Sequence, residues 1–172
     1  MLRLIFAFVE IALHRRGPDE LPASQFLFGI VLVAYLAVAF TTLRLGAAVT
    51  HPILLLIVDT AFSLTFIWSV LKAFKHERRF KQTASALLGT DTLLNLLSIP
   101  LLLWGKALES GGGDNSGLAI LFALLAIWSI DISGFVLSRA LDRAYFLGVA
   151  IMLGYVLLSI SLRLTLFPIP TD

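Results

Sequence analysis

The chain has 172 residues, of which 59% are hydrophobic and 14% are charged, and its mean hydropathy is +0.95. A soluble domain of this size could not bury so much apolar surface, whereas a bilayer accepts it. The absence of cysteine excludes disulfides, thiolate metal sites and cysteine nucleophiles. The net charge of +2 is small and lies in short loops, so we expect no nucleic-acid partner. The composition therefore predicts an all-α integral membrane protein, with one membrane domain over residues 1–172 in contact with the lipid bilayer.

Residues 1–16 form an apolar segment that is interrupted by Glu10 and ends in a basic stretch. The segment is too short to cross the hydrocarbon core, which needs about 20 residues. On a helix, Arg3, Glu10 and His14 would share one narrow face, which predicts an amphipathic helix in the membrane interface. A signal peptide is the alternative, but the segment has neither an uncharged core nor a small-residue cleavage site.

Five apolar segments follow, and each is long enough to cross a membrane as a helix. The expected spans are 25–43, 53–74, 83–104, 118–137 and 144–167. A Gly- and Pro-containing turn at 17–22 precedes the first span, and Ser24 is placed to cap it. Three consecutive glycines, together with Ser, Asp and Asn, predict a flexible loop over 105–117.

The distribution of Lys and Arg predicts the orientation of the chain. With the N-terminus inside, ten basic residues fall in the inner segments, and the outer loops hold only Arg44 and Lys106. Because basic residues accumulate on the cytoplasmic side, we expect a cytoplasmic N-terminus and an outside, periplasmic C-terminus. A bacterial inner membrane is the expected location of such a compact chain, which has no cysteine and no glycosylation-type loop.

Basic side chains near the expected inner surface are candidates for contact with anionic lipid headgroups. These candidates are Arg15, Arg16, Lys75, Arg78, Arg79 and Lys81. The alternative is that they serve only as topology determinants, and the two roles are compatible.

Placing an ionisable group inside a membrane costs free energy, so we expect each such group to have a partner or a functional role. Asp59 and Arg163 both lie near the outer face in the expected topology, which makes them a candidate ion pair if their spans touch. The alternative is that Arg163 extends to the membrane surface.

A second candidate group consists of Asp91, Asn95 and Asp131. Asp91 and Asn95 are four residues apart on one helix face, and Asp131 lies at a similar depth on the next span. Two nearby carboxylates could share an exchangeable proton, which would make the cluster a proton or cation site. The alternative is a purely structural cluster in which a protonated Asp is hydrogen-bonded to Asn95 or a serine.

Catalytic and cofactor motifs are absent from the sequence. The three histidines, His14, His51 and His76, fall on different sides of the expected membrane, so they cannot be paired axial ligands of one haem. HExxH, Gly-x-Ser-x-Gly, Walker A and GxGxxG patterns are all missing. We therefore predict no catalytic residues, no metal or other cofactor and no enzymatic activity.

Two segments resemble a known family. The stretch Arg78–Leu88 has a basic start and a phenylalanine before a polar-tinged span with a late Pro100. The stretch Ala126–Leu141 has a tryptophan in its span and ends in a basic turn. With the chain length and five spans, this layout resembles the bacterial branch of the Yip domain family, relatives of the Rab-interacting membrane proteins. The resemblance implies a non-enzymatic membrane scaffold and assigns no functional residues.

The sequence thus predicts a non-catalytic polytopic membrane protein that acts as a scaffold or binds a membrane-protein partner or a second copy of itself. One alternative is proton- or cation-coupled transport through Asp91, Asn95 and Asp131. Five spans are few for a carrier, although a homodimer would supply ten. Another alternative is an accessory subunit of a larger membrane complex.

Overall fold

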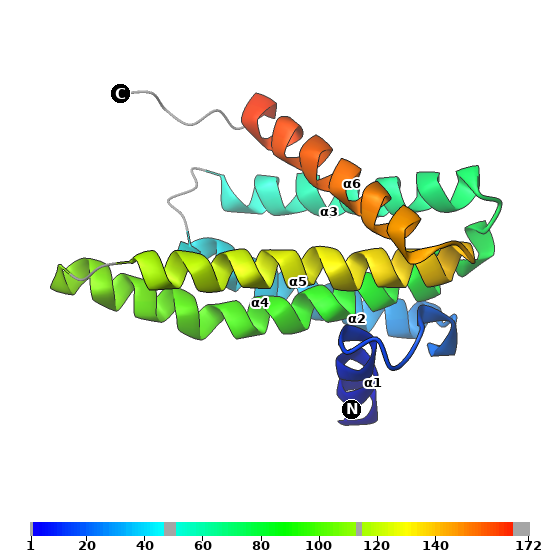
Figure 1. Ribbon diagram of the computed structural model, residues 1–172, viewed down its shortest axis with the longest axis horizontal. Coiled ribbons are helices and arrows are strands. Elements are labelled where there is room, and N and C mark those ends of the chain that lie inside the picture. The colour runs from blue at the N-terminus through cyan, green and yellow to red at the C-terminus, as the bar shows by residue number, and fades with distance from the viewer. Residues whose placement is uncertain (1, 47–50, 113–114, 167–172) are drawn as a thin grey trace.

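A computed structural model describes residues 2–46, 51–112 and 115–166, and this part of the chain contains helices and no strand. A short helix and a 3-10 turn precede five long helices (Figure 1). The elements are α1 (Leu2–Ala12), η1 (Pro18–Glu20), α2 (Gln25–Gly46), α3 (Pro52–Ala73), η2 (Glu77–Arg79), α4 (Phe80–Gly111), α5 (Ser116–Leu141) and α6 (Tyr145–Leu166).

Helices α2 to α6 are each long and apolar enough to cross a membrane, which agrees with the expected all-α membrane fold. Helices α2 to α5 run along the long axis of the molecule, and α6 is tilted away from them (Figure 1). Ser24 caps α2 as expected, because its hydroxyl oxygen accepts a hydrogen bond from the Leu27 amide at 3.4 Å.

The expected loop over 105–117 is wrong for most of its length. Helix α4 continues through Pro100 and ends only at Gly111, and α5 already begins at Ser116. The segment after Trp104 contains Lys, Ala, Leu and Glu, which favour helix over loop. Gly112 ends the helix with a φ of +68°, a left-handed conformation that glycine adopts readily.

The other ends of the expected spans shift by a few residues. Helix α5 extends to Leu141, four residues beyond the expected end of its span, and Asp142 ends the helix with a φ of +51°. Helix α2 also runs three residues further than expected, to Gly46. Membrane-spanning helices commonly extend beyond the apolar segment, because polar residues at their ends still form backbone hydrogen bonds.

Helix α1 lies across the long helices rather than alongside them (Figure 1). Its buried face, which includes Phe8 and Ile11, packs on α4 and α5. At Gly89 of α4 a Cβ atom would lie only 2.5 Å from Phe8 Cδ1, so glycine makes room for this ring. The opposite face of α1 is apolar too, because Phe6 and Val9 are exposed.

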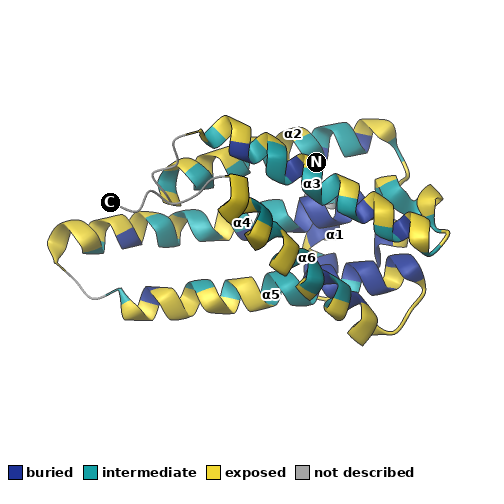
Figure 2. Cartoon of the chain, turned by 90° about the horizontal axis from the view of Figure 1, so that it is seen from above, coloured by how far each residue is buried: buried dark blue, intermediate teal, exposed yellow. Residues whose placement is uncertain are grey.

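The tightly packed core lies at the end of the bundle that carries η1, η2 and residues 139–145, called here the basic end. Buried residues gather there, and the opposite end of α4 and α5 is largely exposed (Figure 2). Helices α5 and α6 approach closely near this end, where a Cβ atom at Gly134 would lie 2.9 Å from the Cα of Val149. Small residues allow such close contact between membrane helices.

Candidate functional site

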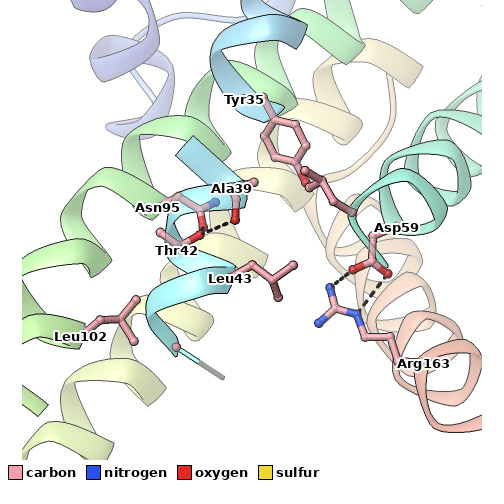
Figure 3. A pocket seen from close by; sticks show the side chains of 10 residues that line it. Tyr35, Ala39, Thr42, Leu43, Asp59, Asn95, Leu102 and Arg163 are labelled. Carbon is pink, nitrogen blue, oxygen red and sulfur yellow. Dashed lines mark hydrogen bonds and ion pairs between the residues drawn. The ribbon is translucent and has the colours of Figure 1, made fainter. Parts of the chain in front are cut away.

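A polar cleft opens in the half of the bundle that lies away from the basic end. Helices α2, α3, α4 and α6 form its walls, and its volume is about 300 Å³. Its polar lining residues are Tyr35, Thr42, Asp59, Asn95 and Arg163 (Figure 3). The rest of the lining is apolar, as it is in most binding sites for small polar groups.

Asp59 of α3 and Arg163 of α6 form an ion pair on one side of the cleft. Arg163 Nη2 lies 2.6 Å from Asp59 Oδ2, and Arg163 Nε donates a hydrogen bond of 3.1 Å to Asp59 Oδ1. The structure thus brings together the two residues that the sequence suggested as partners. The side chain of Asp59 is 14% exposed and that of Arg163 is 56% exposed. Because a guanidinium has five N–H donors, Arg163 keeps donors available for another group.

The other side of the cleft is formed by Thr42 of α2 and Asn95 of α4. The Thr42 hydroxyl lies 3.1 Å from Asn95 Oδ1 and donates a hydrogen bond of 3.0 Å to the Ala39 carbonyl. Asn95 Nδ2 donates to the backbone carbonyl of Asp91 at 2.8 Å. These bonds fix the Asn95 amide against its own helix and against α2.

Tyr35 lies between these two groups (Figure 3). Within the described residues its hydroxyl has no hydrogen-bond partner, although it lines the cleft. It is close enough to Asp59, Asp91 and Arg163 to interact with them electrostatically. A buried hydroxyl normally finds a partner, so this group is available to whatever enters the cleft.

The expected cluster of Asp91, Asn95 and Asp131 is not assembled. Asp91 faces a small cavity between α3, α4, α5 and α6, while the Asn95 side chain lines the polar cleft. Asp131 contacts His14 and Tyr145 instead. The similar depth of these residues could be predicted from the spans. The partners of Asp131 depend on the rotation of α5 about its axis, which packing decides.

Asp131 of α5 contacts one residue that follows α1 and one at the start of α6. His14 Nε2 lies 3.5 Å from Asp131 Oδ2, and the Tyr145 hydroxyl donates a hydrogen bond to Asp131 Oδ1. The His14 ring also packs edge-on against Phe135. Glu10 is paired as well, with Arg16 at 3.2 Å. Two of the three residues of the expected polar face, Glu10 and His14, are therefore engaged by protein groups, and the side chain of Arg3 lies outside the described part of the chain.

Two of the six candidate lipid contacts have partners within the protein. Arg16 also pairs with Glu20 at 2.8 Å, and Arg79 pairs with Asp142 at 2.9 Å. Arg79 further donates hydrogen bonds to the carbonyls of Arg139 and Ala140, which end α5. The Arg79 guanidinium holds the pKa of Asp142 below its usual range.

The remaining candidates, Arg15, Lys75, Arg78 and Lys81, are exposed at the basic end and keep their charge available. Arg79 is not available in the same way, because it donates to carbonyls in the last turn of α5 that lack intrahelical partners.

Sequence reasoning missed two polar members of the cleft, Tyr35 and Thr42. Each is unremarkable in an apolar span. Only the packing of the helices shows that Tyr35 and Thr42 share the cleft with Asp59. Tyrosine in the middle of a span, away from the interfaces where aromatic residues gather, was the available signal.

The chain was compared with protein-family models, with curated proteins and with solved structures, and none of them matches.

Proposed function

We propose that the protein is a non-catalytic membrane protein that binds a polar group of another membrane component in the polar cleft. The proposal rests on polar groups in the cleft that retain unused hydrogen-bonding capacity. Arg163 has donors left over and the Tyr35 hydroxyl has no partner among the described residues. Inside a bilayer such groups favour a polar ligand, because lipid tails offer them no hydrogen bonds. A binding role agrees with the scaffold function that the resemblance to the Yip family implies.

We also propose an orientation of the protein in the membrane. The basic end faces the cytoplasm, as the Lys and Arg distribution of a bacterial inner-membrane protein requires. Helix α1 then crosses the bundle near the inner interface, with its exposed apolar side chains, such as Phe6 and Val9, toward the lipid tails. A reporter fused after Asp172 should be active only outside the cytoplasm, and activity inside would contradict this orientation.

The binding proposal is tested by photocrosslinking in native membranes. A photoreactive amino acid at Leu102, which lines the cleft, should give one discrete adduct. The same amino acid at Phe146, which is 82% exposed on the surface of α6 and lies outside the cleft, is the control. The substitution Arg163→Gln should abolish the adduct from position 102. If positions 102 and 146 give the same products, or Arg163→Gln changes nothing, the cleft is not a binding site.

The mass of the adduct also distinguishes the possible partners, since a second copy of this chain, a different protein and a lipid differ in size. A partner recovered at fixed stoichiometry would make the chain a subunit of a larger complex. Recovery of the chain alone, crosslinked to itself, would make it a homo-oligomer.

Transport is the second candidate function, and the cavity beside Asp91 is the observation that favours it. The two-carboxylate form of the hypothesis loses support, because Asp91 and Asp131 have different surroundings. A route through Asp91 alone would still predict proton flux in liposomes that is lost in Asp91→Asn. Flux that persists in this variant would exclude Asp91 from the route.

A further inference from the structure

A small cavity lies in the middle of the bundle, where α3, α4, α5 and α6 meet. Its volume is about 70 Å³, and it is separate from the polar cleft. Its polar lining residues are Ser63, Asp91, Ser129, Ser133 and Tyr155, which come from all four helices. We call this space the Asp91 cavity. A volume of this size holds about two water molecules, at roughly 30 Å³ each.

The polar groups of the Asp91 cavity are not satisfied by one another. Within the described part of the chain, the Asp91 carboxylate forms no ion pair and no hydrogen bond. The hydroxyls of Ser129 and Ser133 have no hydrogen-bond partner there either, although Ser133 is only 5% exposed. Asp91 is half-buried between these helices, and a carboxylate without a partner away from water is energetically unfavourable, so the cavity favours a positively charged occupant that takes oxygen ligands.

Tyr155 gives the cavity a fixed wall. Its ring stacks on Phe62 with centroids 5.7 Å apart and contacts Phe66 at 5.1 Å. Ser63 and Tyr155 both line the cavity, from α3 and α6. Packing between α3 and α6 therefore holds the Tyr155 side chain in place before any ligand binds.

The available ligands identify the class of occupant. All of them are oxygen atoms, which suit hard cations, and only one of the groups is a carboxylate. A monovalent ion would leave the cavity neutral, whereas a divalent ion would leave a buried positive charge. The described residues contain no group of three or more His, Cys, Asp or Glu side chains that could hold a metal ion. Hydroxyl and carboxylate oxygens near the middle of a helical bundle are suitable ligands for Na⁺.

We propose that the Asp91 cavity binds a single Na⁺ ion, held by the Asp91 carboxylate and by the hydroxyls of Ser63, Ser129 and Ser133. The ion neutralises Asp91, the one carboxylate among the described residues that line the cavity. It also joins α3, α4 and α5 through their side chains, so binding stabilises the packing of the bundle.

The test is thermal unfolding of the purified full chain in detergent, with NaCl replaced by N-methylglucamine chloride at constant ionic strength. A ligand that binds only the folded state raises its stability with the logarithm of ligand concentration above Kd. We expect Tm to rise in this way with Na⁺. Direct binding of radioactive sodium to the wild-type protein should saturate at one ion per chain.

Two variants and a control assign the site. Asp91→Asn should abolish the Na⁺ dependence of Tm. Ser133→Ala should raise the half-saturating Na⁺ concentration about tenfold, since one ligand to a charged group is lost. Ser98→Ala is the matched control, because Ser98 lies on the same helix as Asp91 and, among the described residues, its hydroxyl bonds only to the backbone carbonyl of Asn95. It should leave the Na⁺ dependence unchanged.

Three results would overturn the proposal. The first is a wild-type Tm that does not change with Na⁺ concentration, together with no saturable binding of radioactive sodium. The second is a Tm that depends on pH at every Na⁺ concentration and on Na⁺ at none, which would make the occupant a proton. The third is a Na⁺ dependence that Ser133→Ala leaves intact. The first two measurements need only the wild-type protein, so they decide the matter even if Asp91→Asn does not fold.

Discussion

The close contact between α5 and α6 makes a quantitative prediction for Gly148→Ala. A Cβ atom at this position would meet the carbonyl oxygen of Gly134 and lie 2.8 Å from the backbone nitrogen of Ser138. Both are backbone atoms of α5 and cannot rotate away. The two helices must therefore separate, and the buried side chains beside the contact lose part of their packing.

The magnitude follows from the cost of overpacking, which is about 1–3 kcal/mol for added methylene groups in well-packed interiors. Because the obstacle is backbone on the facing helix, we expect the upper part of this range, about 2–3 kcal/mol. For a chain of this length each kcal/mol lowers Tm by roughly 2–4 °C. Gly148→Ala should therefore lower Tm by about 4–12 °C.

Thermal unfolding in detergent micelles measures this effect, and Gly154→Ala is the matched control. Gly154 lies on the same helix, and a Cβ atom there would have no atom within 4 Å. Alanine is the better helix former by up to about 1 kcal/mol, so Gly154→Ala should be neutral or stabilising. Equal Tm values for the two variants would refute the argument, because the contact at Gly148 would then be absent in the folded protein.

Further predictions concern the basic end. Arg79 lowers the pKa of Asp142, so this ion pair stabilises the fold at pH values above the unfolded-state pKa of Asp142. The stabilisation is lost as the pH falls and the carboxylate is protonated. Acidification should therefore lower Tm more in the wild type than in Asp142→Asn. Phe8→Ala should undock α1 and speed proteolysis of the N-terminal segment, at a cost of up to about 3–5 kcal/mol, whereas Phe6→Ala, at an exposed position, should not. For the protein purified in detergent, Lys81→Gln should weaken the binding of added anionic lipids more than that of neutral lipids, and equal loss for both would exclude headgroup attraction.

The five spans could be predicted because their apolar composition is a local property that the bilayer imposes on every spanning helix. The pairing of Asp59 with Arg163 could be suggested for a related reason, since two opposite charges at similar depth have few other partners in lipid. The ends of helices were harder. Gly111 rather than Trp104 ends α4, because polar residues outside the apolar segment still favour helix.

The partners of Asp131 could not be predicted, because they depend on where α1 packs. Nothing local in residues 1–16 indicates that Phe8 will lie over Gly89 of α4, which brings His14 to Asp131. The same holds for the glycines. Gly148 and Gly154 look alike in the sequence, yet only Gly148 faces another helix closely. Contacts between distant segments require the rotation of each helix, and apolar spans without a polar face do not specify it.

The position of α1 has a consequence for biosynthesis. This helix leaves the ribosome before α2 to α6, yet it packs on α4 and α5, and α5 ends roughly 130 residues later. At about 5–20 residues per second, translation of that stretch takes roughly 6–26 s. During this time the apolar faces around Phe8 have no protein surface to cover them. Helix α1 is therefore made before α2 to α6 but reaches its place only after α5 has been inserted, and until then a bilayer surface or a chaperone must cover its apolar faces.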